Sequence, residues 1–464
     1  MHASASFPQT FRRAINVALT VLLGLLLAVG ATAQSFAQGR VPIVRDAEIE
    51  ALVRDYARPI LKAAGLSKSG IDIILVNDPS FNAFVVGRRM FINTGTLLQA
   101  ETPNEVIGVI AHEAGHIAGG HQERLRDQLA RMQTMALVSA VLGIGAVVAG
   151  AAAGSGELAQ AGGGIVAGGG EFARRALLGY QRSEETTADR SAFDYLEATG
   201  QSTKGMLTTF QRFQNSLSLS GSRIDPYLAS HPMPRERIAN LDALAHSSAN
   251  FDKMDPAPLQ LRHDMMRAKI AVYTQSQAAP SRARKLSGIA AQYGEAHAAY
   301  VRGNPRSALA KTDALLKQQP KNPYLYELRG DVLMKLNKPV DAATAYATAI
   351  KLDPAKSGIL RIAYGQALLS TGKPDSLKKA VVSIQEGLDR DRENTMGYQY
   401  LAQAYNALGE VPEAELATAE GHFYGGNYQQ AKIFAARAQQ KMKRGSPGWL
   451  RAQDIINFRL AKKS

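Results

Sequence analysis

Hydrophobic residues recur every three or four positions along most of this chain, which is the period of helices that bury one side. The segment 44–66 shows this pattern first and predicts an amphipathic helix. Two short apolar runs, 71–76 and 81–86, have instead the length of strands, and Gly-Arg-Arg at 87–89 turns the chain into a third run at 90–93. We therefore expect a mainly α protein with a small antiparallel sheet near its start.

The next helix carries the pattern that points to chemistry. Its apolar run 106–116 follows a capping box, Thr-Pro-Asn-Glu, and ends in His-Glu-x-x-His. Positions i and i+4 lie on one face of a helix, so His112 and His116 can bind one metal ion. Glu113 can then take a proton from a water at the metal. A buried helix that merely carries two histidines is the alternative, but it would bury a carboxylate without a partner.

A catalytic zinc site usually has three protein ligands, so the third must come from elsewhere in the chain. His121 arrives one residue too early for the longer motif His-Glu-x-x-His-x-x-Gly-x-x-His. Further on, 183–190 reads Ser-Glu-Glu-Thr-Thr-Ala-Asp-Arg, in which Glu185 and Asp189 share one helix face. Glu184 competes with Glu185 as the candidate ligand.

These motifs together resemble the M48 metallopeptidases, which pair His-Glu-x-x-His with a later Glu-x-x-Ala-Asp. The resemblance implies a zincin-like α+β domain that holds one Zn²⁺ per chain. It also implies that Glu185 completes the ligand set and that Asp189 orients a ligand histidine. We further expect the neighbouring Arg190 to stabilise the developing oxyanion, although an arginine beside a helical aspartate often forms only a surface ion pair.

Two more segments match the same family. Its Asn-Ala-Phe strand marks the rim of the cleft, which implies that Asn82, Ala83 and Phe84 pair with an extended substrate here; an ordinary inner strand is the alternative. A Ser-His-Pro segment contains His231. We hypothesise that His231 occupies the open zinc position at rest and leaves before substrate binds. A histidine that only caps a helix is the competing interpretation.

The segment 132–170, between the two ligand motifs, is apolar and rich in alanine and glycine. It is nearly long enough to span a bilayer. Glycine triplets at 162–164 and 168–170 interrupt it, and glycine is costly inside a helix. We therefore favour a mobile flap beside the cleft that contacts a membrane surface or a substrate. A buried hairpin and a membrane span are the alternatives.

The first 33 residues have the layout of a secretory signal peptide, with two arginines, an apolar core and Ala-Thr-Ala before a cleavage point after Ala33. Cleavage after Ala37, or an uncleaved anchor, is the alternative. The chain has no cysteine, which excludes disulfides and thiolate metal sites. Its net charge of +14 favours anionic surfaces or acidic partners. No basic stripe with interleaved aromatics is present, so we expect no nucleic-acid binding.

An internal repeat begins after a linker and connecting helix at 251–290. Pro320 and Pro354 are 34 residues apart, and the small and aromatic positions between them follow the tetratricopeptide pattern of paired helices. The second repeat has the strongest match, at Tyr326, Gly330, Ala342, Tyr346 and Ala349. We expect an α-solenoid over 291–445, a tail at 446–464, and a protease domain over 40–250. Such arrays usually hold a peptide or a partner protein, although an irregular helical array without a binding role is the alternative.

The whole arrangement resembles exported M48 peptidases of the bacterial periplasm. It implies a zinc endopeptidase that degrades misfolded or stalled outer-membrane proteins and aids their assembly. The repeats would dock onto the assembly machinery or its clients. A chaperone or adaptor with a latent or structural metal site is the alternative function.

Overall fold

The computed structural model describes residues 42–153, 155–219, 231, 235–274 and 286–459. The expected signal peptide at 1–33 lies outside them. The chain divides into two compact units, which we describe separately. Unit 1 contains Met1–Ile43, Ala57–Asn93 and Asn104–Lys253, and unit 2 contains Val44–Tyr56, Thr94–Pro103 and Met254–Ser464. We expected 40–250 to form one protease domain, whereas the segments 44–56 and 94–103 group with the repeats.

A four-stranded sheet has the strand order β1-β2-β4-β3. Its strands are β1 (Ile43–Val44), β2 (Asp72–Val76), β3 (Ala83–Val86) and β4 (Arg89–Asn93). β3 and β4 pair antiparallel, but β2 and β4 pair parallel. The prediction of an antiparallel sheet is therefore wrong for β2 and β4. After β2 the chain first forms the outer strand β3 and then turns back to form β4 between β3 and β2, so that β4 runs parallel to β2. β3 is the outer strand on one side of the described sheet.

Helix α4 (Pro103–Ala118) begins at the proline that the capping box predicts, and its residues 103–116 are all buried. A helix that is apolar on every side packs against neighbours all round. One of these contacts involves Gly115, where an added Cβ would lie 3.0 Å from the backbone oxygen of Ala188. The glycine thus lets α4 approach α6 (Gly156–Ala198) closely, which brings the two predicted ligand motifs together.

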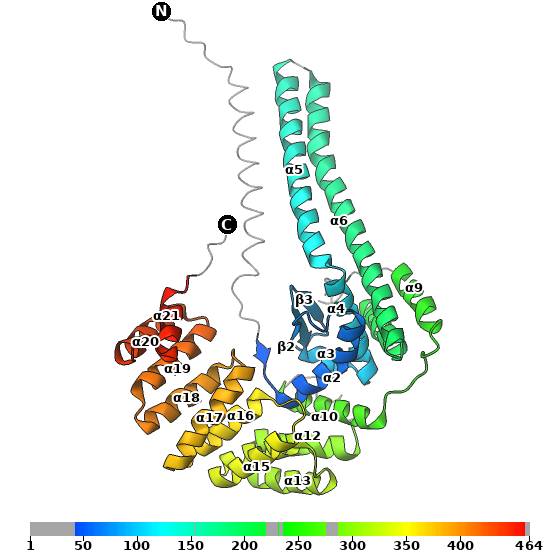
Figure 1. Ribbon diagram of the computed structural model, residues 1–464. Helices are drawn as coiled ribbons and strands as arrows, with labels where there is room; N and C mark the ends of the chain where they lie inside the picture. The colour runs from blue at the N-terminus through cyan, green and yellow to red at the C-terminus, as the bar shows by residue number, and fades with distance from the viewer. Residues whose placement is uncertain (1–41, 154, 220–230, 232–234, 275–285, 460–464) are drawn as a thin grey trace, which may run out of the picture. The chain divides into compact units, whose positions relative to one another are not determined.

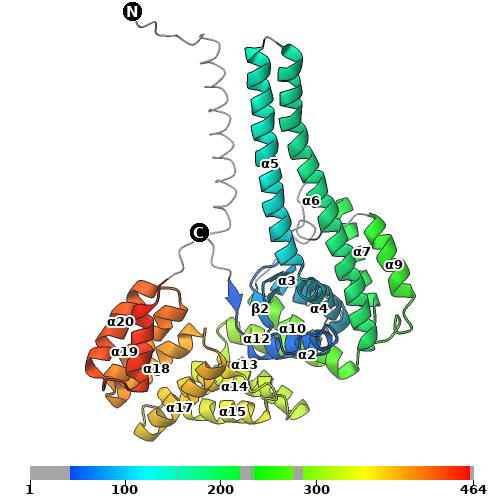
Figure 2. The same cartoon turned by 45° about the horizontal axis from the view of Figure 1, so that its top comes forward.

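A long hairpin is formed by α5 (His121–Ala152) and α6, which run side by side in both views (Figures 1 and 2). The glycine triplets 162–164 and 168–170 lie inside α6, so the expected interruption is wrong. Met135, Val138 and Leu142 are 59%, 52% and 63% exposed, which also argues against a buried hairpin. Among the described residues, no helix has the length and apolar character that crossing a membrane requires.

Unit 2 is a stack of helix pairs, and successive pairs follow one another along the chain (Figure 2). Tyr346, Ala342 and Ala349 of the second predicted repeat are almost completely buried. The other helices of the two units are α2 (Ala47–Ala63), α3 (Thr94–Gln99), α7 (Lys204–Leu219), α9 (Arg235–His246), α10 (Ala257–Tyr273), α12 (Gly288–Val301), α13 (Pro305–Gln318), α14 (Pro323–Lys335), α15 (Pro339–Leu352), α16 (Gly358–Leu369), α17 (Pro374–Arg390), α18 (Thr395–Leu408), α19 (Val411–Tyr424), α20 (Tyr428–Lys441) and α21 (Pro447–Asn457).

The expected tail at 446–464 contains the helix α21. The Ser446 side chain accepts a hydrogen bond from the Trp449 backbone N–H, and Pro447 stands at the first turn, so the helix start is capped. Ala452 and Ile455 are buried in a cluster with residues of α19 and α20. The tail prediction is wrong for 447–457, because an apolar stripe on the last helix covers the end of the stack.

The start of α2 packs into the repeats of unit 2. Ala47 and Ala51 lie in one apolar cluster with Tyr324, Ala349 and Leu360. Beside this cluster is a polar group, in which Lys269, Glu48 and Tyr293 are buried and Asp46 is half-buried. Lys269 Nζ lies 2.7 Å from Asp46 Oδ2 and 3.2 Å from Glu48 Oε2, and the Tyr293 hydroxyl donates to Glu48 Oε2 at 2.6 Å.

Candidate metal centre

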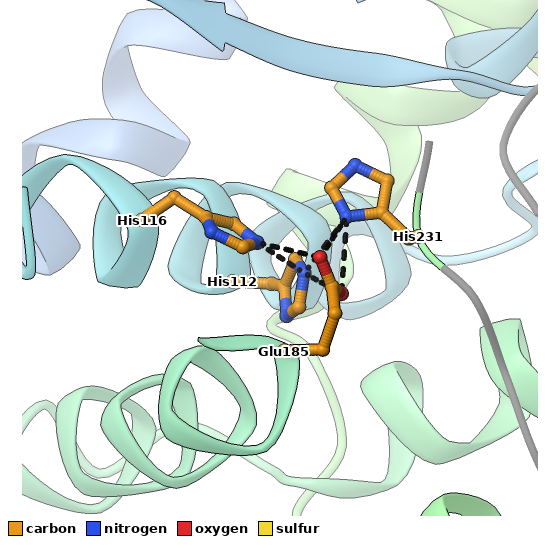
Figure 3. A group of neighbouring side chains, drawn as sticks. All are labelled: His112, His116, Glu185 and His231. Atoms are coloured by element: carbon orange, nitrogen blue, oxygen red, sulfur yellow. Dashed lines mark hydrogen bonds and ion pairs between the residues drawn. The ribbon is translucent and has the colours of Figure 1, made fainter. Parts of the chain in front are cut away.

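Four buried side chains of unit 1 bring their nitrogen and oxygen atoms together (Figure 3). His112 and His116 come from α4, Glu185 comes from α6, and His231 comes from the segment before α9. One ligand atom from each lies within 4.8 Å of all the others. Figure 3 shows the two rings of α4 and the carboxylate of α6 pointing toward one another, with the ring of His231 on the other side of the carboxylate.

The separations between these atoms suit a small tetrahedral ion. His112 Nε2 lies 3.0 Å from His116 Nε2 and 3.4 Å from His231 Nδ1. Glu185 oxygens lie 3.4 Å from each of these two Nε2 atoms and 3.1 Å from His231 Nδ1. Ligand atoms at about 2.0–2.1 Å from a tetrahedral zinc are separated by about 3.3 Å. The chemistry and spacing of these donors therefore fit zinc.

Glu113 gives an independent indication of chemistry. Its carboxylate is completely buried, and neither oxygen accepts a hydrogen bond from the described residues. One basic atom, His231 Nε2, lies 3.4 Å from Oε1 and forms an ion pair with it when protonated. Burial raises the pKa of Glu113. A buried carboxylate without a hydrogen bond is costly for the fold, so its presence favours a functional role beside the donors.

Asp189 lies where the sequence predicts a supporting residue. Its Oδ1 is 3.0 Å from His112 Nδ1, the ring atom that faces away from the other donors. Burial by itself would raise the pKa of Asp189, but hydrogen bonds from Arg237 and His112 lower it below its ordinary value. Burial also opposes protonation of His112, yet Asp189 and Glu185 raise its pKa to about 9. The carboxylates of Asp189 and Glu185 thus favour a positive charge at His112.

Arg237 is the residue that the sequence analysis missed. Its Nε and Nη2 donate to Asp189 at 2.5 Å and 2.8 Å, and its Nη1 lies 2.8 Å from Glu185 Oε2. Its guanidinium also stacks over the ring of Phe210 at 5.3 Å. Arg237 was visible in the sequence as part of the segment after His231. Nothing in that segment distinguishes a buried arginine from an exposed one.

Arg190 does not join the cluster. Its side chain is exposed on α6 and lines a hollow of about 410 Å³ whose other lining residues include Thr186, Arg237 and Asn240 but none of the four donors. Successive helix positions point about 100° apart, so the residue after Asp189 faces away from Asp189's partners. The expectation that Arg190 stabilises the oxyanion therefore has no support in the geometry.

Glu184, the competing candidate ligand, belongs to a neighbouring group. Its Oε2 lies 3.0 Å from His121 Nε2 and accepts a hydrogen bond from Arg124 Nη2 at 2.7 Å. Glu185 is therefore the residue of this pair that faces the donors. His121, which fits no ligand motif in the sequence, lies with its Nδ1 2.8 Å from His116 Nδ1.

A cavity of about 170 Å³ opens beside the donors, and Phe84 and Val85 of β3 line it together with Glu113 and His116. The Ala83 carbonyl lies 3.4 Å from His231 Nε2, and the Phe84 ring stacks on Phe91 at 4.9 Å. The carbonyl of Asn82 accepts a hydrogen bond from the Asn93 backbone N–H at 3.0 Å. The outer strand β3 of the described sheet therefore lies at the cavity.

Comparison with known proteins agrees with this geometry. Residues 44–245 match the model of peptidase family M48, and residues 293–357 and 328–376 match that of the tetratricopeptide repeat. The chain is thus a metalloprotease in which a peptidase M48 domain is followed by tetratricopeptide repeats.

Several curated proteins are similar to this chain. The beta-barrel assembly-enhancing protease of Escherichia coli (strain K12) is 24% identical over 427 residues, which cover 88% of this chain and 82% of the relative. The putative beta-barrel assembly-enhancing protease of Vibrio cholerae serotype O1 is 25% identical over 87% of this chain and 82% of its own length. Metalloprotease YcaL of Escherichia coli (strain K12) is 33% identical over 31% of this chain and 50% of its own length. The first two likenesses therefore extend over both the M48 domain and the repeats.

Proposed function

We propose that this chain is an exported, zinc-dependent endopeptidase of the periplasm that degrades misfolded or stalled outer-membrane proteins and aids their assembly. The observation that carries the catalytic part is the convergence of His112, His116 and Glu185 beside the buried carboxylate of Glu113, which accepts no hydrogen bond from the described residues. The relatives named as assembly-enhancing proteases support the biological part. The predicted signal peptide at 1–33 supports export.

In this proposal His112, His116 and Glu185 hold one zinc ion per chain. Zinc, when bound, polarises the scissile carbonyl and makes water a stronger acid. Glu113 accepts the proton of the attacking water and later passes it to the leaving amine. Burial raises the pKa of Glu113, which makes its carboxylate a better proton acceptor.

The neighbouring residues then have defined tasks. Asp189 Oδ1, 3.0 Å from His112 Nδ1, favours a proton on this nitrogen, which leaves the Nε2 lone pair for the metal. Arg237 holds that aspartate through two hydrogen bonds. The backbone of Asn82, Ala83 and Phe84 offers an extended substrate a strand to pair with, which suits cleavage of unfolded chains.

We propose that His231 occupies the fourth position at the metal while the enzyme is at rest. Its Nδ1 lies 3.4 Å from His112 Nε2 and 3.1 Å from Glu185 Oε1, which places it among the donors. Water and substrate need this position, so His231 has to leave before cleavage. His231→Ala should raise peptidase activity while the zinc content stays at one per chain; a loss of both zinc and activity would contradict the gating role.

The repeats would dock onto the outer-membrane assembly machinery or onto unfolded clients, as stacked helix pairs commonly do. The exposed apolar residues of the α5/α6 hairpin, Met135, Val138 and Leu142, would add peripheral contact with a membrane. The excess of basic residues assists both kinds of contact. We propose no role for nucleic acid.

The decisive experiment combines metal analysis with a degradation assay. The purified protein should contain one zinc ion and degrade casein, and a chelator should stop the degradation. Glu113→Gln should abolish cleavage and keep the zinc. Glu123→Gln is the matched control, because Glu123 is an exposed glutamate on α5 and should leave activity unchanged. A folded preparation that binds no zinc, or full activity of Glu113→Gln, would refute the proposal.

A second function is favoured by the extent of the repeat array, which makes up most of unit 2. The chain would then act in assembly as a chaperone or adaptor with a latent or structural metal site. The Glu113→Gln protein distinguishes the two functions in cells. Full support of outer-membrane assembly by this variant would assign that task to the repeats, and loss of support would assign it to proteolysis.

A further inference from the structure

His121 is a buried histidine that the catalytic proposal does not use. It is the first residue of α5 and is 4% exposed. Its Nδ1 lies 2.8 Å from Nδ1 of His116, and the two rings meet edge to face with centroids 4.8 Å apart. Its other nitrogen, Nε2, lies 3.0 Å from Glu184 Oε2, which also accepts a hydrogen bond from Arg124. Three helices, α4, α5 and α6, thus contribute to one chain of polar contacts that ends at His116.

The backbone before His121 is shaped to place this ring. At Gly119, an added Cβ would lie 2.2 Å from His121 Nε2 and 2.5 Å from its Cδ2. Any other residue at 119 would therefore push the ring out of its place. Gly120 follows with a φ of +64°, a conformation that favours glycine, and it turns the chain from α4 into α5. The two glycines together fold the His121 ring back over His116.

The positions of the protons follow from which atom of His116 faces the donors. His116 Nε2 points at His112 Nε2 (3.0 Å) and at Glu185 (3.4 Å), so this nitrogen needs a free lone pair to bind a metal. Neutral imidazole then carries its proton on Nδ1. That N–H can donate to His121 Nδ1, 2.8 Å away. The proton of His121 is then on Nε2, which lies 3.0 Å from Glu184 Oε2, so the chain of contacts ends beside a carboxylate.

We propose that His121 and Glu184 are positioning residues that fix the tautomer and the ring orientation of the ligand His116. They do for His116 what Asp189 does for His112, with one additional histidine between the carboxylate and the ligand. The inference rests on the proposed function, in which His112, His116 and Glu185 hold zinc. Partners of this kind typically change metal affinity by about 10–100-fold when they are removed.

The test measures metal binding rather than turnover. We would measure zinc affinity by competition with a chelating dye for His121→Ala, Glu184→Gln and Gly119→Ala in the full protein. Gly119→Ala removes no polar group; its closest clash is with the His121 ring, and its Cβ would also lie 3.0 Å from the Gly115 backbone oxygen. The matched controls are His246→Asn, which removes an exposed histidine of α9, and Glu123→Gln, which removes an exposed glutamate of α5. The visible absorption spectrum of Co²⁺-loaded protein reports ligand geometry at the same time.

We expect about a 10–100-fold weaker zinc affinity for His121→Ala and Gly119→Ala, with a smaller loss for Glu184→Gln, whose amide oxygen still accepts a hydrogen bond. The Co²⁺ spectrum should change in all three variants, and both controls should match the wild type. A purely structural role would instead lower the stability of the metal-free protein and leave the spectrum unchanged.

The experiment separates failure of the proposed function from failure of the positioning role. If the wild type binds no zinc, the proposed function fails. If the wild type binds zinc and the variants keep its affinity and spectrum, the positioning role of His121 and Glu184 is overturned while the proposed function stands. Should His121→Ala fail to fold, Glu184→Gln decides the question, because it replaces only one oxygen at the end of the contacts farthest from the metal. A zinc affinity and a Co²⁺ spectrum of Glu184→Gln equal to those of the wild type would overturn the proposal.

Discussion

Replacing Lys269 with methionine tests the buried charges that fasten the start of α2 to the repeats. Lys269 is buried, and its Nζ contacts Asp46 and Glu48 at 2.7 Å and 3.2 Å. Methionine fills nearly the same volume, so the change mainly removes the charge. Removing one partner of a buried ion pair leaves an uncompensated charge and costs about 3–5 kcal/mol. We expect a loss of this size in the free energy of unfolding of unit 2 at pH 8.

The pH dependence of this loss has a definite sign. Burial raises the pKa of Glu48 above its ordinary value of 4.5, and Lys269 acts to lower it. Without Lys269 the folded-state pKa rises further, while the unfolded-state pKa stays where it is. Between these two values the folded state binds more protons than the unfolded state, so its stability falls as pH rises. The deficit of Lys269→Met should therefore be smallest near pH 4.5 and grow toward pH 8.

Urea unfolding followed by circular dichroism measures this loss, with Lys321→Met as the control because Lys321 is exposed. The single tryptophan, Trp449 in α21, reports the far end of the stack. Since stacked helix pairs are coupled mainly to their neighbours, we expect the Trp449 transition to shift less than the overall one. A loss below about 1 kcal/mol at pH 8, or a deficit that shrinks as pH rises, would refute the reasoning.

Three further predictions concern the site and the repeats. Arg237→Gln should destabilise the metal-free protein by about 3–5 kcal/mol, because Asp189 and Glu185 lose a buried cation; a loss under 1 kcal/mol in urea unfolding would contradict this. Gly330→Ala should cost about 1–3 kcal/mol in thermal unfolding, because a Cβ would lie 2.6 Å from the Tyr346 ring. Gly179→Ala, inside α6 with open space around it, should instead stabilise by about 0.5–1 kcal/mol. Zinc at a free concentration of 100 times its Kd should stabilise unit 1 by about 2.7 kcal/mol, measured by unfolding with and without a chelator; equal stability in both conditions would argue against a metal that binds the folded state.

The parts of the site that the sequence predicts are those set by local spacing. His112 and His116 stand four residues apart on a helix, so their common face follows from the helical period. Glu185 and Asp189 could be found because they repeat this spacing on a second helix. Arg237 and His121 could not, because their roles depend on contacts that no periodicity describes. Arg237 meets Asp189 across 48 residues of sequence, and His121 meets His116 through a turn that two glycines form.

The same distinction explains the errors in the fold. The glycine triplets of α6 predict an interruption if helix propensity alone decides, yet the helix runs through both of them. The parallel pairing of β2 with β4 depends on a crossing of the chain that the alternation of apolar residues does not encode. The repeats were predictable because each helix pair repeats the same small and aromatic positions, and their helices follow from local sequence.

The family match and the structure assign the start of α2 to different parts of the chain. The family match begins at residue 44, yet Val44–Tyr56 belongs to unit 2. In that segment Glu48 contacts Lys269 and Tyr293 across 221 and 245 residues of sequence. A chain that ended near residue 250 would therefore expose Ala47 and Ala51 to water and leave Asp46 and Glu48 without their cation. The start of α2 consequently depends on the repeats for its burial and its charge balance, although the family match assigns it to the protease domain.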